Sequence, residues 1–118
     1  MGKRVLVVDD HRQVGDAVAE MLRVMGHDAS YFSSPSMALE WLGESGAVDL
    51  AFVDLSMPGT DGVQTLLRLR ELGYRFPVVI LTGYPESQLA REALASGAHR
   101  IVMKPISMDD LLSLVESI

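Results

Sequence analysis

The chain has 118 residues and a formal net charge of −6, and hydrophobic residues make up 48% of it. These values suit one globular domain, expected over residues 1–118, and the acidic balance argues against direct binding of nucleic acid. The absence of cysteine excludes disulfides and thiolate metal ligands. The apolar run at residues 5–8 is too short for a signal-peptide core or a membrane span, so a cytoplasmic domain without membrane contact is expected.

Strand and helix patterns alternate along the chain. In its first half, strands are predicted over residues 4–8, 29–32 (a weaker pattern) and 50–53, with helices over the apolar repeat of residues 14–25 and after the Ser34-Pro35 pair. In its second half, strands are predicted over residues 77–81 and 101–103, with helices around residues 63–67, 89–94 and 108–115. Asp61 is expected to cap the third helix, and Ser107 with Asp110 has the pattern of a capping box.

Five strands alternating with five helices predict an α/β fold. The short, continuously apolar strand patterns indicate parallel strands buried on both faces. Right-handed crossovers and this length favour a flavodoxin-like three-layer sandwich, with a five-stranded parallel sheet in the order 2-1-3-4-5.

Polar residues follow the predicted strands at the points where the strands end. Asp9 and Asp10 follow the first strand, Asp54 the third, Thr82 the fourth and Lys104 the fifth. In open parallel sheets, ligands bind outside the carboxyl ends of the strands, where the strand order reverses. The three aspartates are therefore expected to converge, with Thr82 and Lys104 beside them.

Such a cluster needs a cation. Two carboxylates about 5 Å apart repel by roughly 3 kcal/mol at an effective dielectric constant near 20. Mg²⁺ prefers one or two carboxylates together with water and phosphate oxygens, and with Lys104 it would balance the three negative charges. An aspartate in this setting can attack phosphorus and form an aspartyl-phosphate, so the cluster predicts phosphoryl transfer.

Four segments in order resemble the signatures of response-regulator receiver domains, the phosphoacceptor domains of two-component signalling. They are Val-Val-Asp-Asp at residues 7–10, Asp-Leu-Ser-Met-Pro-Gly-Thr-Asp-Gly at 54–62, Leu-Thr-Gly at 81–83 and Lys-Pro at 104–105. The resemblance covers nearly the whole chain. It implies a phosphorelay switch that catalyses only its own phosphorylation and dephosphorylation and is not otherwise an enzyme.

The resemblance also implies the roles of the site residues. Asp54 would be the phosphoacceptor. Asp10 and Asp54 would bind Mg²⁺ directly, Asp9 would bind it mainly through water, and the Ser56 backbone carbonyl would be a further ligand. Lys104 would pair with Asp54 and then with the phosphoryl group.

The remaining features of the resemblance concern switching. Thr82 would follow the phosphoryl oxygen and shift its loop, and the Lys104–Pro105 bond is expected to be cis. The chain departs from the family at Ile101, where many receivers carry an aromatic residue that reports phosphorylation. Tyr84, two positions after Thr82, is expected to tune the access of water to the phosphoryl group together with Ser56.

The implied partners are a histidine kinase or a histidine phosphotransfer protein and an unidentified downstream effector. Docking of the phosphoryl donor is expected along the first helix, with Val14 and Val18 as candidates, and near Pro105. A homodimer, if one forms, is expected to use the face between the fourth and fifth helices.

Other functions compete with this interpretation. The isoleucine at position 101 gives some weight to a binding module that does not use phosphate. A magnesium phosphatase with an aspartate nucleophile is a second alternative, but Ser56 stands where its acid should be. An FMN carrier is a third, although Asp9 and Asp10 would repel its phosphate. His11, His27 and His99 are expected to be exposed, without a spacing that indicates a histidine metal site, and Trp41 is expected to be a packing residue.

Overall fold

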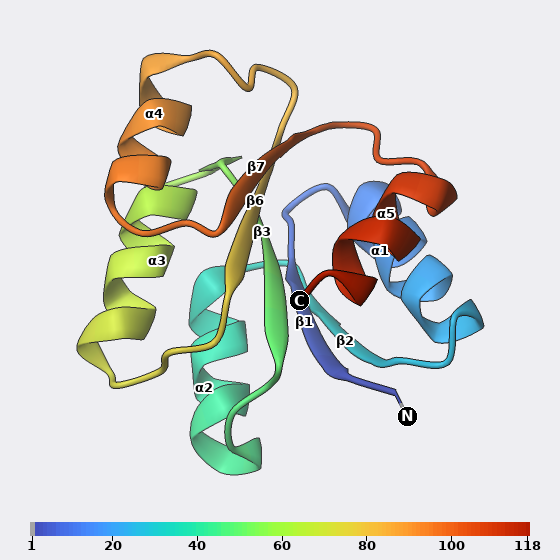
Figure 1. Ribbon diagram of the computed structural model, residues 1–118. Coiled ribbons are helices and arrows are strands. Elements are labelled where there is room, and N and C mark those ends of the chain that lie inside the picture. The colour runs from blue at the N-terminus through green and yellow to red at the C-terminus, as the bar shows by residue number, and fades with distance from the viewer. Residues whose placement is uncertain (1) are drawn as a thin grey trace.

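The computed structural model describes residues 2–118, and these form a sandwich of one parallel sheet between two layers of helices (Figure 1). The sheet has the order β2-β1-β3-β6-β7, which confirms the predicted order of its first to fifth strands. These strands are β1 (Arg4–Val8), β2 (Asp28–Phe32), β3 (Leu50–Asp54), β6 (Val78–Thr82) and β7 (Arg100–Met103). No helix in the described part of the chain has the length and apolar character needed to cross a membrane.

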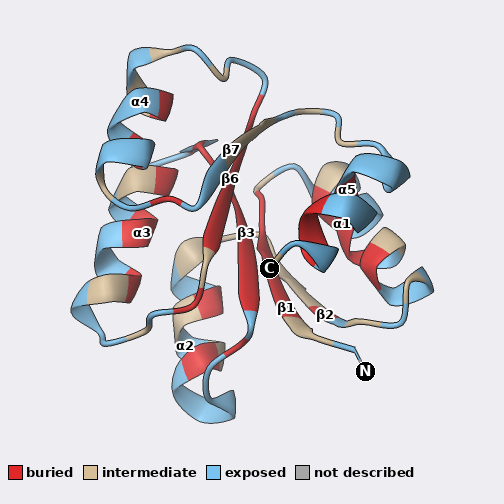
Figure 2. Cartoon of the chain, in the orientation of Figure 1, coloured by how far each residue is buried: buried red, intermediate tan, exposed pale blue. Residues whose placement is uncertain are grey.

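The helices divide between the two faces of the sheet. On one face lie α1 (Arg12–Val24) and α5 (Met108–Glu116), and on the other lie α2 (Pro35–Ser45), α3 (Gly62–Glu71) and α4 (Gln88–Ala95). Successive side chains of a strand point to opposite faces. In β1, Val5 and Val7 accordingly pack with α1 and α5, whereas Leu6 and Val8 pack on the other side. The central strands are buried on both faces, as predicted (Figure 2).

Side-chain caps begin several of the helices. The Ser34 hydroxyl accepts the Met37 N–H at the start of α2, and the Ser107 hydroxyl accepts the Asp110 N–H at the start of α5. Asp61 and Gln64 form a full capping box at the start of α3. These predicted helix starts are confirmed, and the capping of α3 fixes the chain that leads away from Asp54.

Burial on both faces was predicted for the four continuously apolar strand patterns, and this prediction is wrong for β7. Arg100 and Met103 are exposed, and Ile101 and Val102 are only partly buried. The reason is that β7 is an edge strand with β6 as its one neighbour in the sheet. An apolar run in the sequence does not distinguish an edge strand from a central one.

A short antiparallel ladder between β3 and α3 was not predicted. It pairs β4 (Ser56–Met57) with β5 (Thr60–Asp61), and the turn between them contains Gly59 at φ 75°. A residue with a side chain adopts that backbone conformation only at a cost, so glycine suits the turn. The ladder fixes the segment that directly follows Asp54.

Candidate functional site

The register of the sheet sets the acidic residues side by side. Val8 of β1 pairs with Val53 of β3, so the next residues, Asp9 and Asp54, lie level at the carboxyl ends of neighbouring strands. On the other side of β3, Asp54 itself pairs with Leu81 of β6. The convergence expected from the sequence therefore follows from parallel pairing in this strand order.

Lys104 reaches the same point from the edge of the sheet. Its backbone N–H donates to the Thr82 carbonyl at 2.9 Å. Its Nζ lies 2.9 Å from Asp9 Oδ2 and 3.0 Å from Asp54 Oδ1. The side chains of Asp9 and Asp54 are 0% and 5% exposed, so this ammonium compensates two carboxylates that water hardly reaches. The Lys104–Pro105 peptide bond is cis, as expected.

One ammonium does not satisfy all the carboxylate oxygens. Within residues 2–118, Asp54 Oδ2 and Asp10 Oδ1 are buried atoms that accept no hydrogen bond, and Asp9 Oδ2 has only the Lys104 ammonium. Each of the three aspartates offers an oxygen within 4.8 Å of the others. Buried polar atoms are normally satisfied. Oxygen donors in this arrangement fit a hard divalent cation such as Mg²⁺.

The pKa values of Asp54 and Lys104 reflect this environment. Burial raises the pKa of Asp54 from 3.8 to about 6; the hydrogen bond from Lys104 opposes the rise, and the charge of Asp9 adds to it. Burial alone would lower the pKa of Lys104, but its hydrogen bonds to Asp9 and Asp54 outweigh that effect and raise it. At neutral pH the pocket therefore holds a charged lysine beside an aspartate that is ionised at a cost.

Thr82 ends β6 beside the cluster and is almost fully buried. Its hydroxyl accepts the Tyr84 N–H at 3.0 Å, which links the residue to the loop before α4. Tyr84 lies in the loop between β6 and α4, and it is 79% exposed. Ser56, two positions after Asp54, is also exposed, and it pairs with Asp61 in the β4–β5 ladder.

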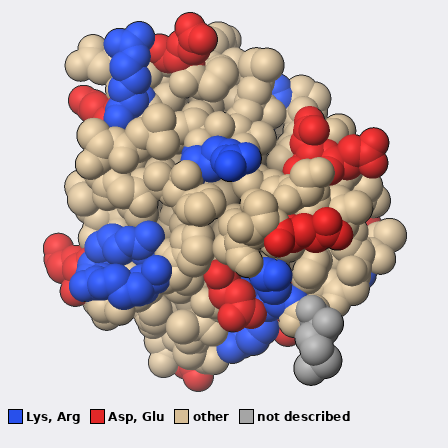
Figure 3. All heavy atoms as spheres, in the orientation of Figure 1, with Lys and Arg blue, Asp and Glu red and all other residues tan. Residues whose placement is uncertain are grey.

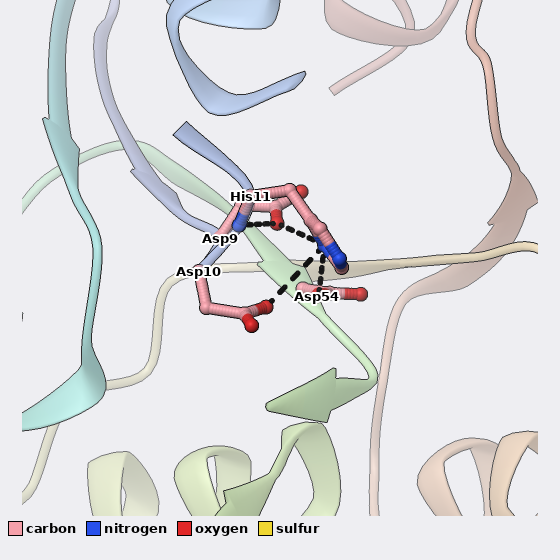
Figure 4. A group of neighbouring side chains, drawn as sticks. All are labelled: Asp9, Asp10, His11 and Asp54. Atoms are coloured by element: carbon pink, nitrogen blue, oxygen red, sulfur yellow. Dashed lines mark hydrogen bonds and ion pairs between the residues drawn. The ribbon is translucent and has the colours of Figure 1, made fainter. Parts of the chain in front are cut away.

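The imidazole of His11 lies over the three carboxylates (Figure 4). His11 is exposed, as expected, and so is His99, whereas His27 is partly buried and its Nδ1 accepts the Lys3 N–H. The sequence places His11 directly after Asp9 and Asp10, beside the expected pocket, but the spacing of the three histidines does not indicate a metal site. The neighbours of His11 are carboxylates, one of which comes from a strand over 40 residues away.

Tyr31 supports the site from β2, and no sequence signal pointed to it. Its hydroxyl donates to the Asp9 backbone carbonyl at 2.6 Å. Burial is the main cause that raises the pKa of Tyr31, with contributions from Asp9 and other nearby carboxylates. The phenol therefore stays protonated and able to donate, which steadies the turn that carries Asp9 and Asp10.

Comparisons with known proteins agree with this site. Residues 5–116 match the model of the response regulator receiver domain family, so the chain belongs to that family. Phosphorylation of an aspartate is the general mechanism of these domains in two-component response regulators. This membership favours a receiver over the phosphatase and FMN-carrier alternatives.

Two regulators and one solved structure illustrate the similarity. The swarming motility regulation protein RssB of Serratia marcescens is 32% identical over 114 residues, which cover 97% of this chain and 52% of that protein. The response regulator protein FleR of Pseudomonas aeruginosa is 35% identical over 115 residues, 98% of this chain and 24% of that protein. The chain thus spans about half of one relative and about a quarter of the other.

The solved structure is the CheY-like response regulator receiver domain protein from Methanospirillum hungatei. It superposes with a TM-score of 0.89 at 26% identity, and the match covers 99% of this chain and 93% of that one. The fold observed here is therefore that of a receiver domain over almost its full length.

Proposed function

We propose that this chain accepts a phosphoryl group on Asp54, in a reaction that requires Mg²⁺, from a histidine kinase or a histidine phosphotransfer protein. The observation that carries the proposal is the environment of the Asp54 carboxylate. This buried group has one oxygen beside the Lys104 ammonium and one that accepts no hydrogen bond within the described chain. Lys104 thus favours the ionised, nucleophilic form of the Asp54 carboxylate, and the unpaired oxygen, Oδ2, is left to bind a cation together with Asp10.

The residues around Asp54 fit a bound Mg²⁺. Asp10 and Asp54 would be direct carboxylate ligands, the Ser56 backbone carbonyl a further one, and Asp9 a ligand through water. Asp9 suits that more distant role because its oxygens already contact the His11 N–H and the Lys104 ammonium. When bound, Mg²⁺ neutralises carboxylate charge and the charge of the phosphoryl oxygens.

In the transfer, the Asp54 carboxylate attacks phosphorus while the bond from phosphorus to the donor's histidine nitrogen breaks. The electron pair of that bond returns to the imidazole of the donor. Lys104, which Asp9 and Asp54 keep protonated, can turn its ammonium to the incoming phosphoryl oxygens. Thr82 would donate its hydroxyl hydrogen to a phosphoryl oxygen, and its link to the Tyr84 N–H would carry the change into the loop before α4.

A groove beside the site suits the phosphoryl donor. It lies between α1 and the segment after β7, and its apolar lining includes Val14, Met21, Pro105 and Ile106. Val14 is partly exposed, whereas Val18 is 3% exposed and lies at the floor of the groove. The donor would therefore contact Val14 and Pro105 and reach Val18 only at depth, while its phosphohistidine faces Asp54.

The test is phosphotransfer from a phosphorylated histidine phosphotransfer protein, followed by mass spectrometry of the receiver. The wild type should gain one phosphoryl group with Mg²⁺ present and almost none with a chelator. Asp54→Asn should gain none. Asp61→Asn is the matched control, because asparagine can keep the helix cap, and it should be phosphorylated like the wild type. Phosphorylation of Asp54→Asn to the wild-type level would refute the proposal.

A module that does not use phosphate is the second candidate, because Ile101 replaces the usual aromatic residue. Ile101 is partly buried in β7 and packs against the core on the α4 side. Beryllofluoride, which imitates an acyl phosphate, separates the two functions. A phosphoacceptor should bind beryllofluoride with Mg²⁺ present, whereas a module that has lost the chemistry should not.

The receiver would pass its signal to an unidentified downstream effector. A homodimer is proposed through the face between α4 and α5, where β7 is an open edge of the sheet. Three apolar side chains on this face are exposed: Leu94 is 51% exposed, Met103 58% and Met108 39%. Figure 3 shows few charged side chains over the middle of this face apart from one basic cluster.

A further inference from the structure

His11 occupies a position that suits a metal ligand. Its Nδ1 lies 3.4 Å from Asp9 Oδ1, 3.4 Å from Asp10 Oδ1 and 3.8 Å from Asp54 Oδ2 (Figure 4). Two of these oxygens, on Asp10 and Asp54, accept no hydrogen bond within residues 2–118, and the Asp54 side chain is only 5% exposed. A nitrogen donor thus faces the same hollow as buried, unsatisfied oxygens.

The backbone of His11 is fixed on both sides. Its N–H donates to Asp9 Oδ1 at 2.9 Å, and its carbonyl accepts the Gly15 N–H at 3.0 Å in the first turn of α1. His11 is the N-cap residue of α1, yet within the described chain its side chain makes no capping hydrogen bond. The imidazole is therefore free to face the carboxylates, and its ring is 65% exposed and open to ions in solution.

We propose that His11 is a ligand that makes this pocket bind first-row transition dications, Zn²⁺ and Co²⁺, more tightly than Mg²⁺. The inference rests on the proposed cation site and adds a nitrogen donor to its carboxylates. The pocket would then bind Mg²⁺ through oxygen ligands alone, whereas it would bind a transition dication through oxygen ligands and His11 Nδ1 together.

Ligand chemistry and spacing both support the assignment. Imidazole nitrogen is a good ligand for Zn²⁺ and Co²⁺, whereas Mg²⁺ prefers oxygen. Ligand atoms bound at about 2.1 Å around a tetrahedral ion lie roughly 3.4 Å apart. The 3.4 Å from His11 Nδ1 to Asp10 Oδ1 matches that separation, and Asp54 Oδ2 at 3.8 Å needs only a small movement. Asp9 Oδ1 keeps its hydrogen bond from the His11 backbone N–H and is not counted as a direct ligand.

The test is isothermal titration calorimetry with Zn²⁺ and, separately, Mg²⁺ on the wild type, His11→Ala and His99→Ala. Loss of the nitrogen ligand should lower Zn²⁺ affinity by about tenfold or more and change Mg²⁺ affinity by less than about twofold. His99 is exposed and remote from the cluster in the sequence, so His99→Ala controls for binding of Zn²⁺ to surface histidine and should match the wild type. The visible absorption of bound Co²⁺ should also change in His11→Ala and remain unchanged in His99→Ala.

The outcomes separate this inference from the proposed function. If His11→Ala keeps wild-type Zn²⁺ affinity, or loses Zn²⁺ and Mg²⁺ affinity in equal proportion, His11 is not a selective ligand. If His99→Ala loses as much Zn²⁺ affinity as His11→Ala, the binding is at the surface and the inference also fails. Failure of the wild type to bind Mg²⁺ would instead count against the proposed function, whatever happens with Zn²⁺.

Discussion

At the scale of single residues, Asp54 combines two requirements that oppose each other. As the proposed nucleophile, Asp54 must be ionised, but burial beside Asp9 makes its ionisation unfavourable. Lys104 offsets part of that cost, and the rest remains as an instability of the folded state. The proposed cation and phosphoryl site is therefore expected to weaken the fold that carries it.

Asp54→Asn should stabilise the fold in a way that depends on pH. The pKa of Asp54 is about 6 in the fold, against an ordinary value of 3.8, so between these values the folded chain binds more protons than the unfolded one. The unfolding free energy of the wild type therefore falls as pH rises through this window. With a chelator present, Asp54→Asn should be more stable than the wild type above pH 6, and the gap should close near pH 4.

Urea unfolding at a series of pH values measures this gap. Asp28→Asn is the control, since Asp28 is an exposed carboxylate at the start of β2. This variant keeps Asp54, so its unfolding free energy should fall with rising pH as that of the wild type does. A gap between Asp54→Asn and the wild type that stays constant from pH 4 to pH 7 would show that ionisation of Asp54 is not its source.

Tyr84→Ala should speed the loss of the phosphoryl group from Asp54. The large Tyr84 side chain stands 79% exposed two positions after Thr82, and its N–H is bonded to the Thr82 hydroxyl. Its removal should open the site to water and raise the dephosphorylation rate severalfold, with Mg²⁺ affinity unchanged. The rate is measured from the decay of phosphorylated receiver after the donor is removed. An unchanged rate would exclude Tyr84 as a barrier to water.

At the scale of elements, the contact between β2 and α1 depends on a glycine. Gly15 in α1 is buried against the ring of Tyr31, and a β-carbon at position 15 would overlap that ring. The same tyrosine donates its hydroxyl hydrogen to the Asp9 carbonyl. Close packing of helix and strand therefore affects the turn that carries Asp9 and Asp10.

Gly15→Ala should destabilise the fold by about 1–3 kcal/mol, the usual range for an overpacked core position. Gly43→Ala in α2 is the matched control, because no described atom lies within 4 Å of a β-carbon there. Alanine favours a helix over glycine, so Gly43→Ala should stabilise the fold by about 0.5–1 kcal/mol. Chemical denaturation measures both changes, and a Gly15→Ala variant as stable as the wild type would show that the Tyr31 ring can move aside.

Local sequence signals predicted the helix starts but not the exposure of every strand. Ser34 and Asp61 each accept a hydrogen bond from the residue three positions later, so their roles could be inferred without knowledge of the fold. The exposure of β7 depends on which strand lies beside it, and the β4–β5 ladder depends on the path from β3 to α3. Those properties are set by the assembled sheet.

At the scale of the whole molecule, strand order made most of the site predictable. Once β1 and β3 were expected to be neighbours, the meeting of Asp9, Asp54 and Lys104 followed from the ends of the strands. His11 and Tyr31 could not be assigned in the same way. Their contacts depend on side-chain directions at the first turn of α1 and across β2, which no pattern in the sequence specifies.

If the face between α4 and α5 forms a homodimer, Met103→Glu should weaken it. Met103 is 58% exposed on the edge strand, and a carboxylate in a buried interface would be costly. Met37→Glu is the control, since Met37 is 52% exposed but lies on α2. Sedimentation with beryllofluoride and Mg²⁺ should show fewer dimers for Met103→Glu alone. Equal dimer fractions in both variants and the wild type would exclude Met103 from the interface.

The parallel sheet also has a consequence for biosynthesis. Its site joins a turn at Asp9 and Asp10 to Lys104, which is synthesised later in the same chain. A nascent chain that lacks Lys104 would hold its acidic turn without the ammonium that compensates it. The proposed ability to accept a phosphoryl group should therefore arise only once β7 has joined the sheet, so that incomplete chains are not phosphorylated.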